Sequence, residues 1–142
     1  MGIVQAVCIS AEKGTEKKDI GQGELVQQYG LKGDAHAGNG HRQVSLLSLQ
    51  KIEEFRAAGA EIFYGAFGEN IVAEGIDLAK VPVGTRLHCG EAMLEITQIG
   101  KECHDRCEIY KRMGDCIMPR EGVFARVLHG GMVKKGDVIN VE

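Results

Sequence analysis

The feature that most limits the possible folds is the distribution of glycine along the chain. The sequence of 142 residues contains 20 glycines, only two prolines and no tryptophan. Glycine adopts positive φ at little steric cost, so frequent glycines favour tight turns and close backbone approaches. Between the glycines lie short runs rich in β-branched and other apolar residues, a pattern typical of strands. The distribution predicts a mainly β fold, a compact barrel with a few short helices.

The spacing of apolar residues predicts the individual elements. Strands are expected at 2–10, 24–29, 43–47, 70–73, 123–128 and 137–141, and a hairpin at 86–98. A helix is expected between Ser48 as N-cap and Gly59 as stop, because apolar residues recur at helical spacing, namely Leu49, Ile52, Phe55 and Ala58. A second helix is expected at 105–113. Without repeats or a linker, the length predicts a single domain, 1–142.

The charges are unevenly distributed. The net charge is −3, yet residues 101–135 contain eight basic and five acidic side chains, a local excess of three positive charges. This suits an anionic small partner and is too weak for a nucleic-acid interface. No apolar run is long enough to span a bilayer, and no targeting signal is visible at the N-terminus. We therefore expect a cytoplasmic protein with reduced thiols.

The segment ECHDRCEIYKRMGDC contains three of the five cysteines, Cys103, Cys107 and Cys116. A zinc site with His104 or His129 is one interpretation, although the spacing C-x3-C-x8-C matches no common structural-zinc pattern. A disulfide is disfavoured by the odd cysteine count and the expected compartment. Burial as small apolar side chains is a third interpretation. The fourth is a reactive or metal-ligating thiol.

The neighbours of Cys103 favour the reactive thiol. Lys101 and Arg106 are close in sequence, and Cys103 lies just before the helix expected at 105–113. Nearby cations and a helix N-terminus both stabilise a thiolate. This placement would lower the pKa of the Cys103 thiol.

Two further clusters contain polar residues among glycines. The loop GLKGDAHAG, followed by His41 and Arg42, can turn backbone N–H groups toward an anion while Lys32 or Arg42 supplies charge. The alternative is a solvated turn in which Asp34 bonds its own backbone. In GAFGEN, Glu69 and Asn70 either hydrogen-bond the edge of a heterocycle or cap a buried loop.

These stretches together resemble the MOSC family, named for the C-terminal domain of molybdenum cofactor sulfurases. The resemblance begins near Gly30 and rests on motifs in family order, namely GLKGDAHAG with RQVSLLS, GAFGENI, VPVGTRLHCGEAMLEIT and GVFARVLHGG. Many members read Arg-x-Pro-Cys where this chain has Gly100-Lys101-Glu102-Cys103. The cysteine spacing is closer to the small stand-alone bacterial members.

The resemblance implies a MOSC-type β-barrel, similar to the β-barrel of pyruvate kinase, that binds molybdenum cofactor. In that family a cysteine carries sulfur as a persulfide or ligates molybdenum. By position this is Cys103, also the implied metal ligand, and Cys107 is the rival because Arg106 precedes it. The implied cofactor pocket also contains Lys32, His36, Arg42, Asn70 and Arg106.

The function that this resemblance implies is a sulfur carrier, or sulfurtransferase, or a module that delivers molybdenum cofactor. The chain has no room for a pyridoxal-phosphate domain, so its partners would be a sulfur-donating cysteine desulfurase and a molybdoenzyme or cofactor-biosynthesis protein. Neither nucleic acid nor a membrane is an expected partner. The alternatives are a small molybdenum-cofactor-dependent reductase of N-hydroxylated compounds and a non-catalytic, zinc-stabilised binding module.

Overall fold

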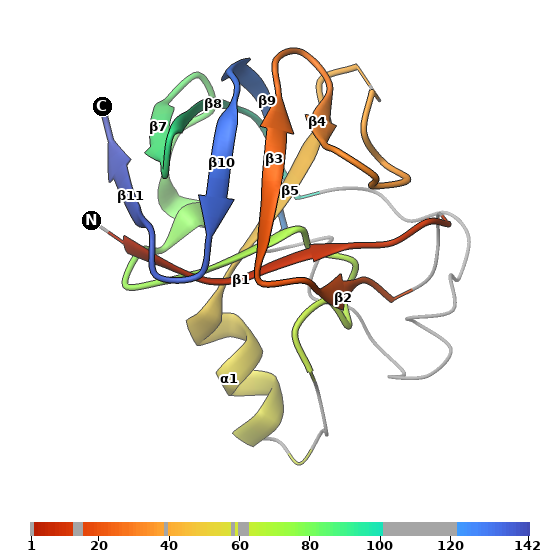
Figure 1. Cartoon of the computed structure of the whole chain (residues 1–142). Helices are drawn as coiled ribbons and strands as arrows, with labels where there is room; N and C mark the ends of the chain where they lie inside the picture. The colour runs from red at the N-terminus through yellow and green to blue at the C-terminus, as the bar shows by residue number, and fades with distance from the viewer. Residues whose placement is uncertain (1, 13–15, 39, 58, 60–62, 101–121) are drawn as a thin grey trace.

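The computed structural model describes residues 2–12, 16–38, 40–57, 59, 63–100 and 122–142. Seven strands form a closed barrel, which Figure 1 shows from the side. In the order in which they pair, these strands are β11 (Val138–Val141), β7 (Arg86–Cys89), β8 (Ala92–Ile99), β9 (Val123–His129), β5 (Val44–Ser48), β6 (Ile71–Glu74) and β1 (Gly2–Ile9). The mainly β barrel that the glycine pattern predicted is confirmed.

Strand β1 closes the barrel because it pairs on both sides. It is antiparallel to β6 along most of its length and antiparallel to β11 at Gly2 and Ile3. The β5–β6 pair is parallel, and the other barrel pairs are antiparallel. Closure leaves the barrel without an unpaired edge, so backbone N–H and C=O groups are satisfied around the ring.

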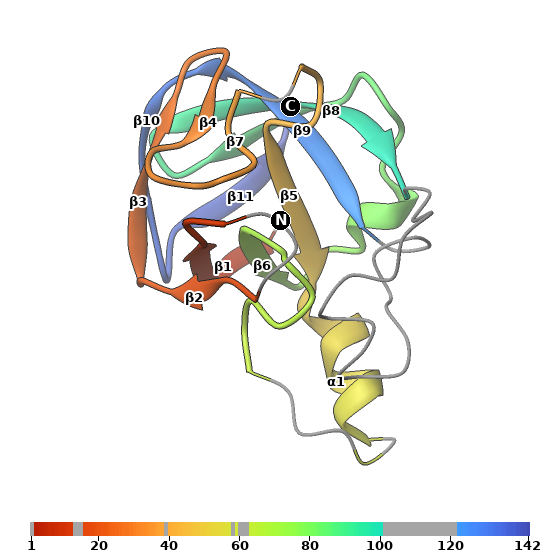
Figure 2. The ribbon, with the colours of Figure 1, turned by 90° about the vertical axis from the view of Figure 1, so that its right-hand side faces the viewer.

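A smaller sheet and two short elements lie outside this ring. The sheet contains β3 (Gln22–Val26), β4 (Gly30–Leu31) and β10 (Gly131–Lys134), and Figure 2 shows β3, β4 and β10 together at one side of the barrel. Strand β2 (Lys18–Asp19) pairs with the end of β1, and a 3-10 helix, η1 (Leu78–Lys80), follows β6. The loop from β4 to β5 contains most of the predicted pocket residues.

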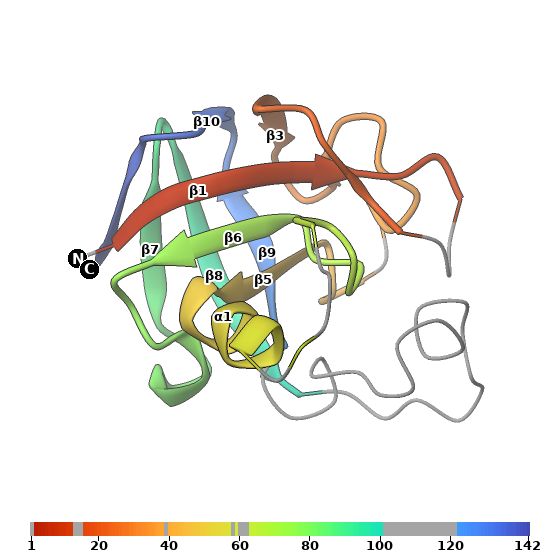
Figure 3. The same ribbon diagram turned by 90° about the horizontal axis from the view of Figure 1, so that it is seen from below.

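The apolar side chains form two cores that share β1. Val4 and Val7 point into the barrel with the side chains of the other strands, whereas Ala6 and Cys8 point outward. A register shift between Val4 and Ala6 adds one residue to β1, so Val4 and Val7, three residues apart, face the same side. The outward core is covered by α1 (Leu49–Ala57), which Figure 3 shows against β5 and β6. Burial of apolar surface on both faces therefore fixes β1, β5 and β6 firmly.

Most predicted elements are confirmed, with one correction and three omitted strands. The predicted strands and the hairpin are present, and α1 ends before Gly59, whose φ is 101°. Ser48 was predicted to cap the helix, but it ends β5, and its hydroxyl donates to the Ile76 carbonyl and accepts from the Leu78 N–H. Strands β2, β4 and β10 were not predicted, because each is short and dense in glycine or charge.

Two expectations extend beyond these observations. The helix expected at 105–113 lies outside the described residues, and the single domain over 1–142 stays a prediction. In the part of the chain that is described, no helix has both the length and the apolar character needed to cross a membrane.

Candidate functional site

The loop between β4 and β5 presents its side chains in two directions. Lys32 and Arg42 are exposed, and the Arg42 guanidinium lies 5.9 Å from the centre of the Phe124 ring. His36 is half-buried, whereas Asp34 turns inward and is only 5% exposed. The loop therefore offers two cations to solvent and one carboxylate to the interior.

The inward carboxylate meets a lysine that is completely buried. The Lys17 ammonium lies 2.6 Å from Asp34 Oδ1, 3.2 Å from Ser10 Oγ and 2.9 Å from His36 Nδ1. Asp34 Oδ1 also accepts from the backbone N–H of Ser10, and its Oδ2 accepts from the N–H of His36. We call Ser10, Lys17, Asp34, His36 and Glu69 the ionic cluster.

The hydrogen bond from the His36 N–H to Asp34 tests the alternative that this loop is a solvated turn. Asp34 does bond its own backbone two residues on, as a turn would require. The loop is not a simple solvated turn, however, because the same carboxylate is buried and paired with Lys17. The turn and the ion pair together fix where the loop leaves the barrel.

Lys17 determines the ionisation of Asp34. Burial acts to raise the pKa of the Asp34 carboxyl, but the hydrogen bond and the charge of Lys17, with the Ser10 N–H, outweigh it. The pKa of Asp34 is therefore below its ordinary value, and this carboxyl is ionised at neutral pH. A buried pair of this kind is stable only when its remaining hydrogen-bonding groups are also satisfied.

The loop before β6 forms the other side of the ionic cluster. Glu69 is completely buried and accepts the backbone N–H groups of Gly65 and Phe67, each at 3.0 Å. Burial raises the pKa of Glu69 to about 7, although these two bonds and the charge of Lys17 oppose the shift. Gly65 has φ 95°, and a Cβ there would lie 2.1 Å from the Lys17 carbonyl oxygen. Only glycine permits this approach.

Asn70, directly before β6, connects strands β5 and β1 of the barrel. Its Oδ1 accepts from the N–H and the hydroxyl of Ser45, and its Nδ2 donates to the carbonyl of Cys8. Together with Glu69, it shows the loop-capping arrangement that was one of the two alternatives for GAFGEN. The predicted contact of Asn70 with a cofactor stays a prediction.

The glycine-rich loop is hydrogen-bonded to the strand that leads to the cysteine segment. His41 Nε2 lies 2.7 Å from Gln98 Oε1, and Gln98 Nε2 donates to the Gly100 carbonyl at 2.7 Å. Thr97 Oγ1 also donates to the His41 carbonyl. The N–H of Gly100 donates to the Gly122 carbonyl at 2.6 Å. Gly100 and Gly122, which border the cysteine segment in the sequence, therefore lie side by side.

The described cysteines differ from the predicted ones. Cys103, Arg106, Cys107 and Cys116 lie outside the described residues. The two described cysteines, Cys8 and Cys89, are buried and unpaired. Burial raises the pKa of the Cys89 thiol to about 12 and that of Cys8 further still, with nearby carboxylates adding to both shifts. Neither of these two is a reactive thiolate at neutral pH.

A metal centre is not formed by the described side chains. Within residues 2–100 and 122–142, gaps excepted, no three histidine, cysteine or acidic side chains come together as a metal site. The exposed cations and positive-φ glycines of the loop do fit an anionic group, such as the phosphate of molybdenum cofactor. The residues that would hold such a group are Lys32, His36 and Arg42.

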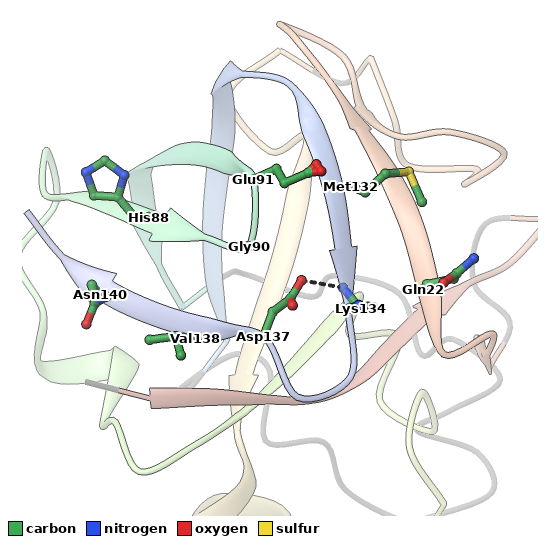
Figure 4. A pocket seen from close by; sticks show the side chains of 9 residues that line it. All are labelled: Gln22, His88, Gly90, Glu91, Met132, Lys134, Asp137, Val138 and Asn140. Atoms are coloured by element: carbon green, nitrogen blue, oxygen red, sulfur yellow. Dashed lines mark hydrogen bonds between the residues drawn. The ribbon is translucent and has the colours of Figure 1, made fainter.

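A separate pocket of about 560 Å³ lies between the barrel and the small sheet (Figure 4). The side chains that line it include His88, Glu91, Lys134 and Asn140, and Asp137 accepts the backbone N–H of Lys134. Of the predicted site residues that the structure describes, namely Lys32, His36, Arg42 and Asn70, none lines it. It is therefore distinct from the loop and the ionic cluster.

The fold and the loop define a small β-barrel domain with a cationic, glycine-rich loop, and comparison assigns the family. A family model described as the MOSC domain matches residues 32–140. The chain therefore belongs to the MOSC domain family, which is associated with molybdenum cofactor binding. A comparison with curated protein sequences finds no match.

Solved structures agree with this fold. The YuaD protein of Bacillus subtilis is 20% identical with a TM-score of 0.81, and the alignment covers 99% of this chain and 96% of that chain. YiiM from Geobacillus stearothermophilus is 16% identical with a TM-score of 0.77, covering 100% of this chain and 75% of that chain. YiiM from Escherichia coli is 18% identical with a TM-score of 0.66, covering 99% and 69%. At these identities the likeness concerns the fold alone.

Sequence reasoning missed Lys17. It lies between Glu16 and Lys18 in a polar stretch, where a lysine is ordinarily solvated. The strand preceding it and the loop that covers it come from different parts of the chain. Nothing in the local sequence separates Lys17 from Lys18, which is exposed.

Proposed function

We propose that this MOSC domain binds molybdenum cofactor and serves as a sulfur carrier or cofactor-delivery module through a thiol of the cysteine segment. Cys103 is the first candidate for this thiol and Cys107 the close second. A cysteine desulfurase would supply the sulfur, and a molybdoenzyme or cofactor-biosynthesis protein would receive the sulfur or the cofactor. The cytoplasm is the expected compartment, because the chemistry requires free thiols.

The observation that carries the proposal is the hydrogen-bonded connection from the glycine-rich loop to the cysteine segment. His41 bonds Gln98, and Gln98 bonds Gly100, three residues before Cys103 in the sequence. The glycine-rich loop is therefore bonded to the end of β8, and the cysteine segment follows β8 directly in the sequence. The family match over 32–140 spans both.

The residues of the loop would bind and orient the anionic end of the cofactor. Lys32 and Arg42 would supply positive charge at the surface, and His36 would contribute a ring N–H. When bound, the cofactor supplies a molybdenum centre that accepts sulfur ligands, and soft thiolate suits such a metal. Removal of charge by Lys32→Gln with Arg42→Gln is expected to weaken binding without unfolding the barrel, since both side chains are exposed.

The carrier step is a thiol–persulfide exchange. The acceptor thiolate attacks the outer sulfur of the donor's persulfide, so one S–S bond forms, the donor's S–S bond breaks, and the donor cysteine leaves as a thiolate. The exchange needs no external oxidant or reductant. Lys101 and Arg106 flank the candidate thiols in sequence and would favour the thiolate form.

Intact-mass measurement after incubation with a cysteine desulfurase and cysteine tests the carrier. We expect a sulfur adduct that reductant removes and that Cys103→Ser abolishes. Loss of the adduct in Cys107→Ser instead would move the role to Cys107. No adduct in the wild-type protein would overturn the carrier function.

A matched control comes from the two described cysteines. The triple variant Cys103→Ser, Cys107→Ser, Cys116→Ser keeps only the buried Cys8 and Cys89. Because burial strongly raises the pKa of both thiols, this variant is expected to take up no sulfur. An adduct on it would show that the assay labels thiols without regard to the proposed site.

Elemental analysis separates the carrier from the two alternative functions. Protein from a host that makes molybdenum cofactor would contain about one molybdenum per chain if it is a reductase of N-hydroxylated compounds, and zinc if it is a zinc-stabilised module. A carrier with an exchangeable cofactor is expected to retain some molybdenum, but less than one per chain, and no zinc. Stoichiometric zinc would overturn the proposed function.

A further inference from the structure

The contacts of Lys17 carry an inference about the proton on a neighbouring histidine. An ammonium group has three N–H donors and no lone pair, so it can only donate hydrogen bonds. Lys17 Nζ has Asp34 Oδ1, Ser10 Oγ and His36 Nδ1 within 3.2 Å. These three contacts equal the three donors.

The Ser10 hydroxyl is consistent with this assignment. Its oxygen lies 3.2 Å from Lys17 Nζ, and the hydroxyl donates its own proton to the Glu12 carbonyl at 3.0 Å. The serine therefore accepts from Lys17 with a lone pair. Asp34 is the ionised partner and has no proton to donate, because its pKa is lowered in this environment.

His36 Nδ1 must then accept the third N–H of Lys17. A ring nitrogen accepts only when it carries no proton, so the proton of the neutral imidazole lies on Nε2. A proton on Nδ1 would place two donors, one of them on a full cation, 2.9 Å apart in a site where Lys17 is 0% exposed. In the neutral ring this leaves the Lys17 donor without an acceptor, and in the doubly protonated ring two like charges would also repel strongly, because little water screens them.

We infer that Lys17 is a positioning residue that holds His36 as the neutral imidazole with its proton on Nε2. His36 then serves the loop as a hydrogen-bond donor rather than as a third positive charge beside Lys32 and Arg42. The ligand class that suits this arrangement is an oxyanion bound by two exposed cations and one directional N–H donor. The assignment of the proton is independent of the proposed function. The role of His36 toward a ligand rests on the proposed function.

Nitrogen NMR of the ligand-free protein tests the assignment directly. Long-range ¹H–¹⁵N correlation spectra of histidine-labelled protein at pH 7 distinguish a protonated ring nitrogen from one with a lone pair. The His36 signals are identified by their absence from His36→Gln. We expect a lone pair on Nδ1 and a proton on Nε2; a protonated Nδ1, alone or with Nε2, would overturn the inference.

A pair of lysine variants tests whether Lys17 is responsible. Lys17→Met removes the three donors with little change in length, and the His36 pattern should change to a mixture of tautomers or a doubly protonated ring. Lys18→Met changes the exposed neighbour and should leave the pattern as it is. An unchanged pattern in folded Lys17→Met would show that Lys17 does not set the tautomer. If Lys17→Met does not fold, the wild-type spectrum still decides the assignment.

The role toward a ligand is read separately, from the molybdenum content of purified protein. His36→Gln retains an uncharged N–H donor and should keep most of the bound molybdenum, whereas His36→Ala should lose most of it. Equal loss in both variants would contradict the donor role while leaving the tautomer assignment intact. Absence of molybdenum from the wild-type protein would count against cofactor binding and hence against this role, again without affecting the NMR result.

Discussion

The ionic cluster and the pocket of Figure 4 are both polar, but they handle their charges differently. In the ionic cluster, Lys17, Asp34 and Glu69 are at most 5% exposed, and each carries hydrogen bonds to defined protein groups. In the pocket, His88 and Glu91 are exposed. Water can therefore replace a lost partner in the pocket and cannot do so in the cluster.

This difference indicates where a single substitution should have a large effect on stability. A buried ion that loses its partner keeps its full desolvation cost, so removing one member of the pair is more damaging than replacing both. An exposed side chain that is truncated leaves groups that water can solvate. The same chemical change should thus have very different effects in the two regions.

The largest effect is expected from Asp34→Asn, which leaves the Lys17 ammonium buried without its counter-charge. Breaking a buried ion pair costs about 3–5 kcal/mol, and we expect a loss of that size in the free energy of unfolding. Urea denaturation at pH 7 measures it. The difference in free energy of unfolding between wild type and Asp34→Asn should disappear as the pH falls through the pKa of Asp34 in the folded protein. A carboxyl whose pKa is lowered on folding stabilises the fold only while it is ionised.

The matched control is Asp137→Asn in the pocket. Its Oδ2 accepts the Lys134 N–H, a bond that the Asn oxygen can retain, so a loss below about 1 kcal/mol is expected. Replacing both members of the buried pair, as Lys17→Met with Asp34→Leu, should cost less than Asp34→Asn alone. Equal costs for Asp34→Asn and Asp137→Asn would remove the contrast between the two regions.

A smaller and pH-dependent effect is expected from Glu69→Gln. The amide oxygen can accept one of the two N–H groups bound by Glu69, so one buried donor loses its partner, at about 1–3 kcal/mol. The pKa of Glu69 is raised on folding to about 7, so its wild-type contribution is greatest below about 4.5 and declines as the pH rises to about 7.

The loss in free energy of unfolding caused by Glu69→Gln should therefore be smaller at pH 8 than at pH 5, since the two values lie above and below the raised pKa of Glu69. Denaturation curves for both proteins at the two pH values give the comparison. Glu54→Gln, on the exposed face of α1 with a side chain 61% exposed, is the control and should show no such trend. A cost that grows with pH would contradict the raised pKa.

The smallest effect is expected from His88→Ala. His88 lies on β7 with its side chain exposed at the pocket, and truncation there should change stability by less than about 0.5 kcal/mol. Thermal denaturation is sufficient to detect a larger change. A loss comparable to that of Asp34→Asn would mean that the pocket, like the ionic cluster, depends on fixed partners.

Much of the fold could be predicted because the elements have local causes. The hairpin of β7 and β8 follows from alternating apolar residues around Gly90, and α1 follows from a helical apolar stripe that ends at Gly59. Strand β10 was not predicted, because Gly131–Lys134 is short and becomes a strand only by pairing with β3. Short strands of this kind depend on their partners rather than on their own residues.

The site was predicted only in part. The loop with Lys32, His36 and Arg42 was identified from its glycines and charges, and the structure places all three on one loop. The cysteine candidates, Cys103 and Cys107, remain predictions, because they lie outside the described residues. The inward direction of Asp34 was not foreseen, since the same residues also make a solvated turn.

The sequence by itself determined the mainly β character, the helix, the hairpin and the family, because apolar periodicity, glycine positions and motif order are properties of the chain. Only the tertiary structure decided which charges are buried. Lys17 and Lys18 are adjacent and chemically identical, yet one is 0% exposed and the other is exposed. The reason is that burial depends on what the rest of the chain places over a residue, here Asp34 and His36 from a loop 17 to 19 residues away.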